Sequence, residues 1–514
     1  MKKEYERFLK NYEDYREMSQ SLDQKDVTMM DYKAVACGVG TYPQRDDKHM
    51  LRLRIPGGRF TRRDLGVILD ICGEYNVKTF KFSTGQSIQI HDLATEEIRH
   101  MMPAFWEKDI LTMGTGGNNP ANVMASPLSG VEEGEYFDVM PYAEAVSKFL
   151  VDSIGVLKLP RKFKVGFSSS DANETHATFK DMGFAATSEG TFEVYGAGGL
   201  GIQPRLGVKF ADHVQPEEVL YYLKAMMLVF SEKGNYLNWK KARSRYLQET
   251  LGVDNLRNMV LEKAEQLKKE ENLDLPAIQE RTTEKSGKGE LAESIRVRRQ
   301  KQHGLYAVLF HPAGGFLAYD RLKALYELTR DMEEVEYRLS VDGGVYVINC
   351  NAEETLQVLE ATPEGAKTAF ETSVSCVGRS RCAIGACNSQ ALLAECMKAV
   401  LPQGFEDGVL PRIAISGCIS SCSAHQAAAI GFRGIMKRTT EGVSPAFHIF
   451  WGGCDEKGKE VLAESTKVLL AEDVPQFLIE LGRTVQASEE KNYKKWILNH
   501  GNVMEAMIER HAFV

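Results

Sequence analysis

The stretch Met50-Leu-Arg-Leu-Arg-Ile-Pro-Gly-Gly58 alternates apolar and charged side chains and then ends in a proline–glycine sequence. Alternation with a period of two predicts a half-buried β-strand, and Pro-Gly-Gly predicts the turn that follows it. Residues Thr61 to Glu74 place their apolar side chains at helical spacing. Thr79 to His91 is typical of two further strands joined by a glycine-containing turn. The order is therefore strand, helix, strand, strand.

The same order returns in the second half of the chain. Leu305 to Phe310 predicts a strand and Asp320 to Arg330 a helix, with a Pro-Ala-Gly-Gly turn between them. Phe80-Lys-Phe-Ser83 and Tyr337-Arg-Leu-Ser340 align at a separation of 257 residues. An internal repeat of this length predicts a duplicated, pseudo-twofold molecule. Chance recurrence of a common pattern is the alternative.

The length, net charge and cysteine content of the chain exclude several classes of protein. The 514 residues allow roughly three domains. A net charge of -8 argues against a nucleic-acid coat or a basic membrane-surface protein. The charged start of the chain lacks the apolar core of a signal peptide, and no run of residues is apolar enough to span a membrane. We therefore expect a cytoplasmic protein with reduced thiols, whose ten cysteines are ligands or core residues.

Two cysteine pairs carry the strongest chemical signal. Ser375-Cys376-Val-Gly-Arg-Ser-Arg-Cys382 is followed by Gly417-Cys418-Ile-Ser-Ser-Cys422. Thiolates are soft ligands that suit iron–sulfur clusters, zinc or copper(I). Five residues between paired cysteines fit structural zinc poorly and a four-cysteine [4Fe–4S] cluster well. The alternative is four buried free cysteines, which is what we expect of the remaining cysteines: Cys37, Cys72, Cys350, Cys387 (in a helix), Cys396 and Cys454.

These motifs resemble the sirohaem-containing sulfite and nitrite reductases, in which Cys-x5-Cys and Gly-Cys-x3-Cys bind the cluster. The resemblance covers most of the chain, and its further segments are Met50–Gly58, Ala125–Gly130, Leu159–Lys164, Ala429–Gly434 and Trp451–Gly453. It implies that Cys376, Cys382, Cys418 and Cys422 hold the cluster and that Cys422 also bridges to the sirohaem iron. It further implies a mixed α+β and α/β fold, with a shared ferredoxin-like domain and two sirohaem- and iron–sulfur-type α/β domains.

The resulting domain prediction has six parts. They are an N-terminal helical arm (1–30), a first ferredoxin-like half-domain (31–104), a first α/β domain (105–267), a charged linker (268–303), a second ferredoxin-like half-domain (304–365) and an α/β domain that carries the cluster (366–514).

The resemblance also implies an anion pocket. Sulfite, nitrite and the cofactor's carboxylates all require guanidinium or ammonium donors. The family's substrate ligands fall on Arg54, Lys162 and Lys164, and the Lys-x-Lys spacing places both lysines on one face of a strand. A solvated strand face is the alternative. The residues expected to contact the cofactor, besides Cys422, are Lys81, Gln86, Gln89 and His91.

Several family positions are altered. Gly85 and Ala121 stand where the family has arginines, Ser420 replaces the Asn of its Cys-Pro-Asn-x-Cys, and Gly234–Trp239 lacks arginines that are common there. Leaving a buried carboxylate without its partner is expensive. Three explanations are open. Nearby cations substitute, the tetrapyrrole is modified and has fewer free carboxylates, or the protein has lost sirohaem chemistry.

The expected function is the six-electron reduction of sulfite to sulfide at a sirohaem, because Lys164 matches the sulfite-type Lys-x-Lys rather than the nitrite-type Lys-x-Asn. Nitrite reduction to ammonia is the nearest alternative, followed by a non-catalytic iron–sulfur electron-transfer protein and a zinc-structured module. We expect no Gly-x-Gly-x-x-Gly turn and no spare flavin or NAD(P)H domain. The expected partners are a small inorganic anion and, as electron donor, a ferredoxin or a reductase subunit, without nucleic acid or membrane.

Overall fold

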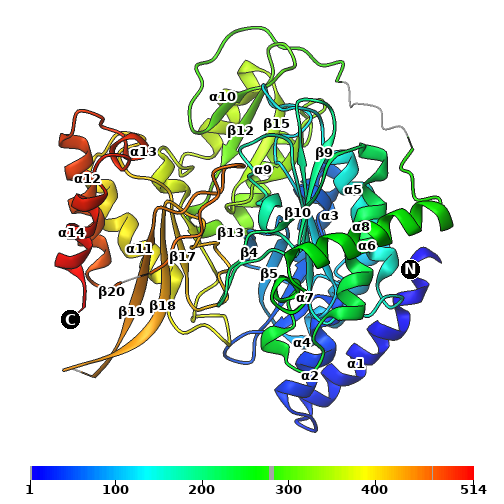
Figure 1. Ribbon diagram of the computed structural model, residues 1–514. Coiled ribbons are helices and arrows are strands. Elements are labelled where there is room, and N and C mark those ends of the chain that lie inside the picture. The colour runs from blue at the N-terminus through cyan, green and yellow to red at the C-terminus, as the bar shows by residue number, and fades with distance from the viewer. Residues whose placement is uncertain (1–2, 277–282, 441, 466, 514) are drawn as a thin grey trace.

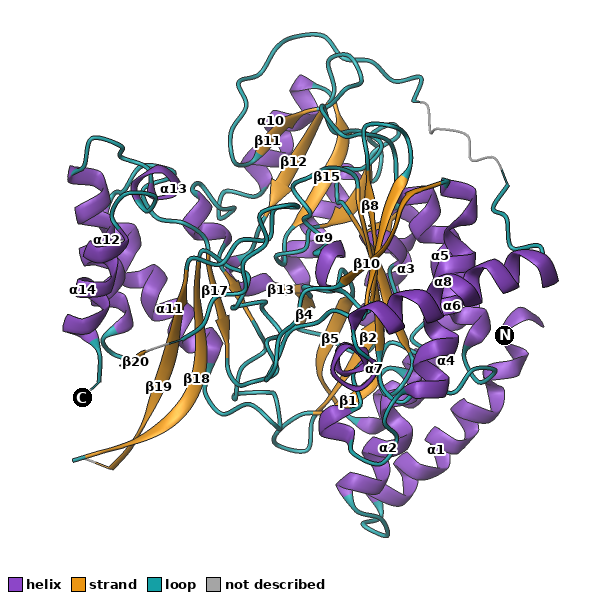
Figure 2. Ribbon diagram, in the orientation of Figure 1, coloured by secondary structure: helices purple, strands orange, loops and turns teal. Residues whose placement is uncertain are grey.

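The computed structural model describes the whole chain except residues 1–2, 277–282, 441, 466 and 514 (Figure 1). It contains four five-stranded sheets. Two central sheets lie between an N-terminal α/β domain, on the right of Figure 1, and a C-terminal α/β domain on the left. Helices cover the outer faces of both α/β domains (Figure 2). Among the described helices, none is both long and apolar enough to cross a membrane.

The N-terminal arm consists of a 3₁₀ turn (Lys3–Phe8), α1 (Leu9–Asp23) and α2 (Met29–Val39). The arm is tied down through Phe8, which is buried and packs edge-on against Trp106 at 6.5 Å. A reciprocal capping box between Thr28 and Asp31 begins α2. The helical arm was predicted to end at residue 30. Because Thr28 caps the start of α2 and this helix continues to Val39, the arm is longer than predicted.

The central sheets have the orders β1-β2-β5-β4-β13 and β11-β12-β15-β14-β3. The strands of the first are β1 (Thr41–Pro43), β2 (His49–Leu53), β5 (Ile88–Leu93), β4 (Thr79–Phe82) and β13 (Phe316–Ala318), and those of the second are β11 (Val297–Arg299), β12 (Tyr306–Phe310), β15 (Val345–Cys350), β14 (Glu336–Leu339) and β3 (Arg59–Phe60). Their helices are α3 (Arg62–Glu74), α4 (Thr95–Glu107), α9 (Tyr319–Thr329) and α10 (Ala352–Ala361).

The repeat is confirmed element by element. β2 and β12, α3 and α9, β4 and β14, and β5 and β15 each begin 257 residues apart. The turns match as well, because Gly57 (φ 60°, ψ 7°) and Gly314 (φ 62°, ψ 14°) share one left-handed conformation. That conformation favours glycine, so the turn glycines that the sequence repeats are required by the backbone.

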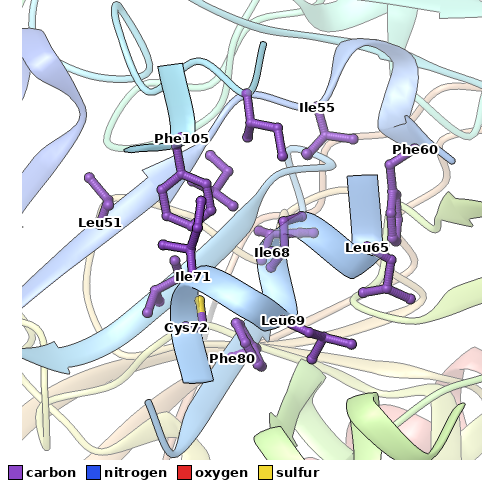
Figure 3. Close-up of a cluster of buried hydrophobic side chains, with 14 of the residues drawn as sticks. Leu51, Ile55, Phe60, Leu65, Ile68, Leu69, Ile71, Cys72, Phe80 and Phe105 are labelled. Atoms are coloured by element: carbon purple, nitrogen blue, oxygen red, sulfur yellow. The ribbon is translucent and has the colours of Figure 1, made fainter. Parts of the chain in front are cut away.

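The two halves exchange strands. β3 of the first half pairs with β14 of the second, and β13 of the second half pairs with β4 of the first. At the first of these contacts the rings of Phe60 and Tyr337 stack with centroids 5.1 Å apart. One hydrophobic core therefore spans both halves, and Figure 3 shows part of it around α3. Neither sheet is complete without a strand from the other half.

The α/β domains repeat a second topology. Their sheets have the orders β6-β7-β8-β9-β10 and β16-β17-β18-β19-β20, each with three parallel strands followed by antiparallel ones. The register matches too, because Val165 pairs with Met182 and Ile413 with Ile430, both 248 residues apart between halves. Corresponding residues of the two domains can therefore be assigned.

The bounds of these elements complete the fold. The first domain contains β6 (Pro120–Ala125), β7 (Phe163–Ser168), β8 (Met182–Ala186), β9 (Phe192–Gly196), β10 (Val208–Val214), α5 (Met140–Ser153), α6 (Val219–Lys233), α7 (Leu247–Leu251) and α8 (Val253–Glu270). The second contains β16 (Val374–Ser375), β17 (Ile413–Ser416), β18 (Ile430–Thr439), β19 (Gly442–Trp451), β20 (Lys467–Leu470), α11 (Ser389–Val400), α12 (Val474–Ala487), α13 (Tyr493–Trp496) and α14 (Gly501–His511).

The mixed α+β and α/β fold class with a ferredoxin-like repeat is confirmed. The predicted linker was too long at both ends, because α8 continues to Glu270 and β11 occupies Val297–Arg299. Its residues 277–282 lie outside the described residues. The other domain boundaries stay predictions.

Candidate cluster and anion site

The four predicted cluster cysteines lie on loops that follow two neighbouring parallel strands. Cys376 comes directly after β16, and Cys418 and Cys422 follow β17. Because carboxyl ends of parallel strands meet at one edge of a sheet, these loops converge there. The backbone N–H of Gly417 donates to Sγ of Cys376 at 3.2 Å. An N–H donor to sulfur is one of the protein's means of tuning an iron–sulfur centre.

The thiols influence one another electrostatically. Burial, together with Cys376 and Cys418, raises the pKa of Cys382. Burial and Cys376 also raise the pKa of Cys422 to about 11, against the opposing effect of Lys162. In the part of the chain that the structure describes, no three His, Cys, Asp or Glu side chains are grouped to hold a single metal ion. Cys382 and Cys422 each interact with Cys376 and Cys418, and such a group of thiols with a backbone donor fits a cluster, which is wider than one ion.

The other cysteines mostly follow the core prediction. Cys37, Cys72, Cys350 and Cys396 are buried, and Cys454 is only half-buried. The predicted helix at Cys387 was wrong. This residue lies in the loop before α11, where Asn388 caps the helix through the backbone N–H of Ala391. The Sγ of Cys387 donates to the Ile435 carbonyl at 3.0 Å, which turns the thiol away from a ligand role.

The two lysines of the predicted pocket lie together beside Cys422. Lys164 is on β7 and Lys162 just precedes it. Burial, then Lys164 and Arg243, lower the pKa of Lys162 to about 7. The pKa of Lys164 is also lowered, first by burial and then by Arg243. Cys422 acts in the opposite direction on both, so the strand does place both ammonium groups near the predicted bridging cysteine.

Further cations, which the sequence analysis missed, join this pair. Arg243 forms an ion pair with Asp181 at 2.7 Å, and burial followed by Lys164 lowers the pKa of Lys180 to about 7. A Cβ atom on Gly201 would lie 3.5 Å from Nη2 of Arg245 and 3.7 Å from the carbonyl oxygen of Ile419. Gly201 therefore lies next to both the Arg245 side chain and the loop that contains Cys418 and Cys422. The available signal was Arg243-Ser-Arg245, two arginines with strand-like spacing just beyond the arginine-poor segment.

Arg54 is placed differently from the prediction. Its side chain is buried, and the guanidinium donates to the carbonyl oxygens of Pro120 at 2.7 Å, Ala121 at 3.0 Å and Met113 at 3.4 Å. Burial lowers its pKa to about 10. In this arrangement Arg54 holds the loop that leads into β6, and its role as an anion ligand stays a prediction.

Gln86 likewise makes structural contacts. Its Nε2 donates to the carbonyl oxygens of Ala125 and Leu339, both at 2.8 Å, and its Oε1 accepts from the N–H of Ala125 at 2.9 Å. The neighbouring Asn122 donates to the carbonyl oxygens of Ile55 at 2.7 Å and Gln86 at 2.8 Å. These two amides join the first half, β6 and β14, and the predicted contact of Gln86 with the cofactor stays a prediction.

Gln89, His91 and Lys81 form a buried polar layer. The Gln89 amide accepts from Nη2 of Arg52 at 2.8 Å and donates to Nε2 of His91 at 3.2 Å. Burial and then Arg381 lower the pKa of His91 to about 3, so its imidazole is neutral. Lys81 donates to the Ser375 carbonyl at 3.1 Å, directly beside the first cluster cysteine. Burial lowers its pKa to about 7.

The altered family positions lie beside these groups. A Cβ atom on Gly85 would meet nothing closer than Oγ of Ser83 at 3.8 Å, so space is available for a side chain. The next residue back, Thr84, donates through its hydroxyl to the carbonyl oxygen of Cys422 at 2.8 Å. Gly85, where the family resemblance predicts an arginine, therefore faces open space close to the loop of Cys422.

One stretch of the chain does have the Gly-x-Gly-x-x-Gly spacing that we expected to be absent. Gly196-Ala-Gly-Gly-Leu-Gly201 matches Gly-x-Gly-x-x-Gly. It joins β9 to β10 rather than a strand to a helix. A dinucleotide-binding turn requires the N-terminus of a helix for the pyrophosphate, so this segment is no such turn.

Comparisons with known proteins match two stretches of the chain to family models. Residues 42–105 match the family model of the nitrite/sulfite reductase ferredoxin-like half domain, and residues 116–268 match the nitrite and sulphite reductase 4Fe-4S domain. The second match covers the first α/β domain, whereas the four cysteines lie in its counterpart. Relatives include a ferredoxin–nitrite reductase of Synechococcus elongatus, 25% identical over 470 residues (86% of this chain and 87% of that protein).

A NADPH sulfite reductase hemoprotein beta-component of Bacillus pumilus is 22% identical over 436 residues, covering 75% of this chain and 73% of that protein. Among solved structures, the NirA protein of Mycobacterium tuberculosis superimposes with a TM-score of 0.77 at 20% identity, covering 94% of each chain. That likeness concerns the fold.

Proposed function

Because this chain belongs to the nitrite and sulfite reductase family and is an oxidoreductase with a [4Fe–4S] cluster and sirohaem, we propose that it reduces sulfite to sulfide by six electrons. The observation that carries the proposal is the position of Lys162 and Lys164, two half-buried lysines beside Cys422 and Arg243. Guanidinium and ammonium groups held in a protein interior bind an oxyanion more strongly than they do in water.

The residues of the chain have two tasks in this reaction. When bound, the cluster and sirohaem supply the electrons and the iron at which the anion is reduced. Lys162, Lys164 and Arg243 hold the anion and offset its negative charge. Removing sulfite oxygens as water also consumes protons. A lysine whose pKa is about 7, as for Lys162, carries a proton that it can release near neutral pH.

Nitrite is the second candidate substrate. It is favoured by the relatives, several of which are named ferredoxin–nitrite reductases at 23–25% identity. The same fold and cations suit either anion, since both are small and negatively charged and both require six electrons and added protons. The second lysine of the Lys-x-Lys pair favours sulfite by its resemblance to sulfite reductases.

We further propose an external electron donor, either a ferredoxin or a reductase subunit, and a cytoplasmic location. Two of the relatives quoted above are named for ferredoxin and NADPH, respectively. The cytoplasm keeps thiols reduced and available as ligands.

The test uses protein purified without oxygen. We expect a visible spectrum with a Soret band and a chlorin-type red band, and turnover of sulfite with reduced methyl viologen at higher kcat/KM than nitrite. Lys164→Asn should shift this preference towards nitrite, because it recreates the nitrite-type pattern. A higher kcat/KM for nitrite in the unchanged protein would favour the second candidate. A cluster spectrum without the chlorin band and without turnover would contradict both and indicate a repurposed electron-transfer protein.

A further inference from the structure

The β18–β19 hairpin is longer than the domain needs. Both strands have ten residues, whereas the corresponding strands β8 and β9 have five each. Only the inner half is held by neighbours, because β17 pairs with Ile430–Arg433 and β20 with Ala446–Ile449. Within the described residues, the outer parts (Met436–Thr439 and Gly442–Pro445) pair only with each other. Figure 1 shows this outer ribbon projecting from the body at the lower left.

One face of the outer ribbon is both apolar and basic. Met436 pairs with Pro445 and Arg438 with Val443, so these four side chains share a face. Met436 is 42% exposed and Val443 62% exposed. Three of the described residues of β18 and β19 are charged, and all three are cations: Arg433, Lys437 and Arg438. Within that described part, the side chains of Lys437 and Arg438 form no hydrogen bond or ion pair.

The base of the ribbon contacts the cluster loops. A Cβ atom on Gly434 would lie 2.7 Å from Cβ of Cys387 and 2.9 Å from the carbonyl oxygen of Gly417. The backbone N–H of Cys387 also donates to that Gly417 carbonyl at 2.9 Å, and Gly417 in turn donates to Cys376. The loop that ends at Cys387 exposes Ile384 at 64%. The base of the ribbon, at Gly434, is therefore one contact layer from the loops that carry the proposed cluster ligands.

We infer that the outer ribbon, with Met436, Arg438, Val443 and Pro445 on one face and Lys437 on the other, docks an acidic one-electron donor protein. The inference rests on the proposed function, which requires electrons from outside the chain. Each docking event transfers one electron, so that the donor is oxidised and the cluster is reduced. Basic groups around an apolar centre match the composition expected of a transient interface.

Local charge is what selects the partner. The chain as a whole has a net charge of -8, so an acidic partner needs a local group of cations in order to bind. Complementary charges steer diffusional encounter. Pairing with a second copy of the chain is the other occupant of an open ribbon, but Lys437, Arg438 and Pro445 are residue types that discourage edge-to-edge strand addition.

The test compares two double charge reversals in the complete, cofactor-loaded protein. Lys437→Glu/Arg438→Glu changes the ribbon, and Lys10→Glu/Lys269→Glu makes the same charge change on α1 and α8, far from it. With reduced acidic ferredoxin at low salt, the ribbon variant should raise the KM for ferredoxin about tenfold, in line with rim-charge effects on association rates. Its turnover should also depend less steeply on ionic strength. Reduced methyl viologen should drive both variants at the rate of the unchanged protein.

Other outcomes would contradict the inference. Unchanged ferredoxin KM in the ribbon variant, or an equal rise in the α1/α8 control, would overturn it, and so would an equal loss of viologen-driven turnover. Val443→Asp provides a second probe, since it places an anion in the apolar centre and should weaken ferredoxin binding in a titration that requires no turnover. A change in oligomeric state on light scattering would instead assign the ribbon to a second copy. Absence of viologen-driven turnover in the unchanged protein would contradict the proposed function, whereas the binding titration would still test the docking face.

Discussion

The two halves of the molecule place different chemistry at equivalent positions. The shared register makes Arg412 the counterpart of Lys164, and the 257-residue repeat makes Asp342 the counterpart of Gly85. In the second half Arg412 forms an ion pair with Asp342 at 2.6 Å, and His311 lies 3.5 Å from the same carboxylate. Among the described residues, Lys164 has no such ion pair. One scaffold therefore either neutralises a cation internally or leaves it available for an external anion.

The cluster position differs in the same way. Ser421 and Asn173 share a left-handed backbone (φ 51° and 49°) at the 248-residue separation, which makes Glu174 the counterpart of Cys422. Burial, then Glu132 and Asp342, raise the pKa of Glu174 to about 8. A carboxyl group is a hard oxygen ligand, unlike the soft thiolate that a cluster needs. The first α/β domain consequently has a carboxyl group where the second has the proposed cluster ligand Cys422.

The largest expected effect comes from removing a cluster ligand. Cys418→Ser should lower the iron content, bleach the visible spectrum and abolish turnover, because the cluster loses one of its four thiolates. The matched change is Ser170→Ala at the equivalent position of the first α/β domain, which should leave iron content and turnover unchanged. Iron analysis and absorption spectra check both. Full iron content in Cys418→Ser would refute the ligand assignment.

Lys164→Ala and its counterpart Arg412→Ala should separate catalysis from stability. Loss of one charge-stabilising donor typically lowers the rate about 10²–10³-fold, so Lys164→Ala should lower kcat by that amount with an unchanged cofactor spectrum. Arg412→Ala should leave kcat nearly unchanged and lower the melting temperature, because Asp342 loses its partner. Steady-state kinetics with reduced methyl viologen and thermal unfolding distinguish the two. Unchanged sulfite turnover in Lys164→Ala would make this lysine a solvated strand residue.

Glu336 joins the halves, and its removal should weaken the molecule as a whole. Burial alone would raise its pKa, but Arg338 and Arg59 lower it to about 2 from an ordinary value of 4.5. Glu336→Gln should lower the free energy of unfolding by about 1–3 kcal/mol. Since the folded-state pKa is depressed, this difference should be constant above about pH 4.5 and shrink as the pH falls towards 2. Urea unfolding at several pH values measures it, and a pH-independent difference would contradict the ion-pair origin.

The smallest effect is expected at Gly85. Gly85→Arg should increase sirohaem retention during gel filtration by about tenfold at most, the equivalent of roughly 1.4 kcal/mol, because the residue faces open space near Cys422. If nearby cations already compensate, retention should stay unchanged. A fall in retention would show that the pocket suits a tetrapyrrole with fewer carboxylates. The absorbance ratio of cofactor to protein is the readout.

The sequence was most informative where local pattern and tertiary structure agree. The helical spacing of Leu65, Ile68, Leu69 and Cys72 predicted α3, and all four are buried. The exchange of β3 and β13 was not predictable, because strands of two and three residues are too short to show a period. The wider cation site was missed for a similar reason. Lys180 and Arg243 come from other segments than Lys164, and only the folded sheet brings them beside it.

Arg54 illustrates a different limit. Its residue type and motif indicated an anion ligand, but the three carbonyl oxygens that surround it come from residues 113–121, and their orientation is a property of the folded loop. A motif fixes which side chain is present, whereas the backbone around it decides which acceptors that side chain meets.

The exchanged strands also bear on how the chain is made. Arg59 of β3 bonds to Glu336 of β14, 277 residues further along the chain. β4 cannot pair with β13 until the chain has been synthesised to residue 318, where β13 ends. At the usual pace of translation, roughly 5–20 residues per second, the nascent first half spends about ten to fifty seconds with one sheet edge unpaired. An exposed edge of this kind attracts other chains. The strand exchange that joins the two halves of the mature molecule thus makes folding depend on a late pairing between distant parts of the chain. We expect temperature, chaperones and expression rate to act on this pairing step.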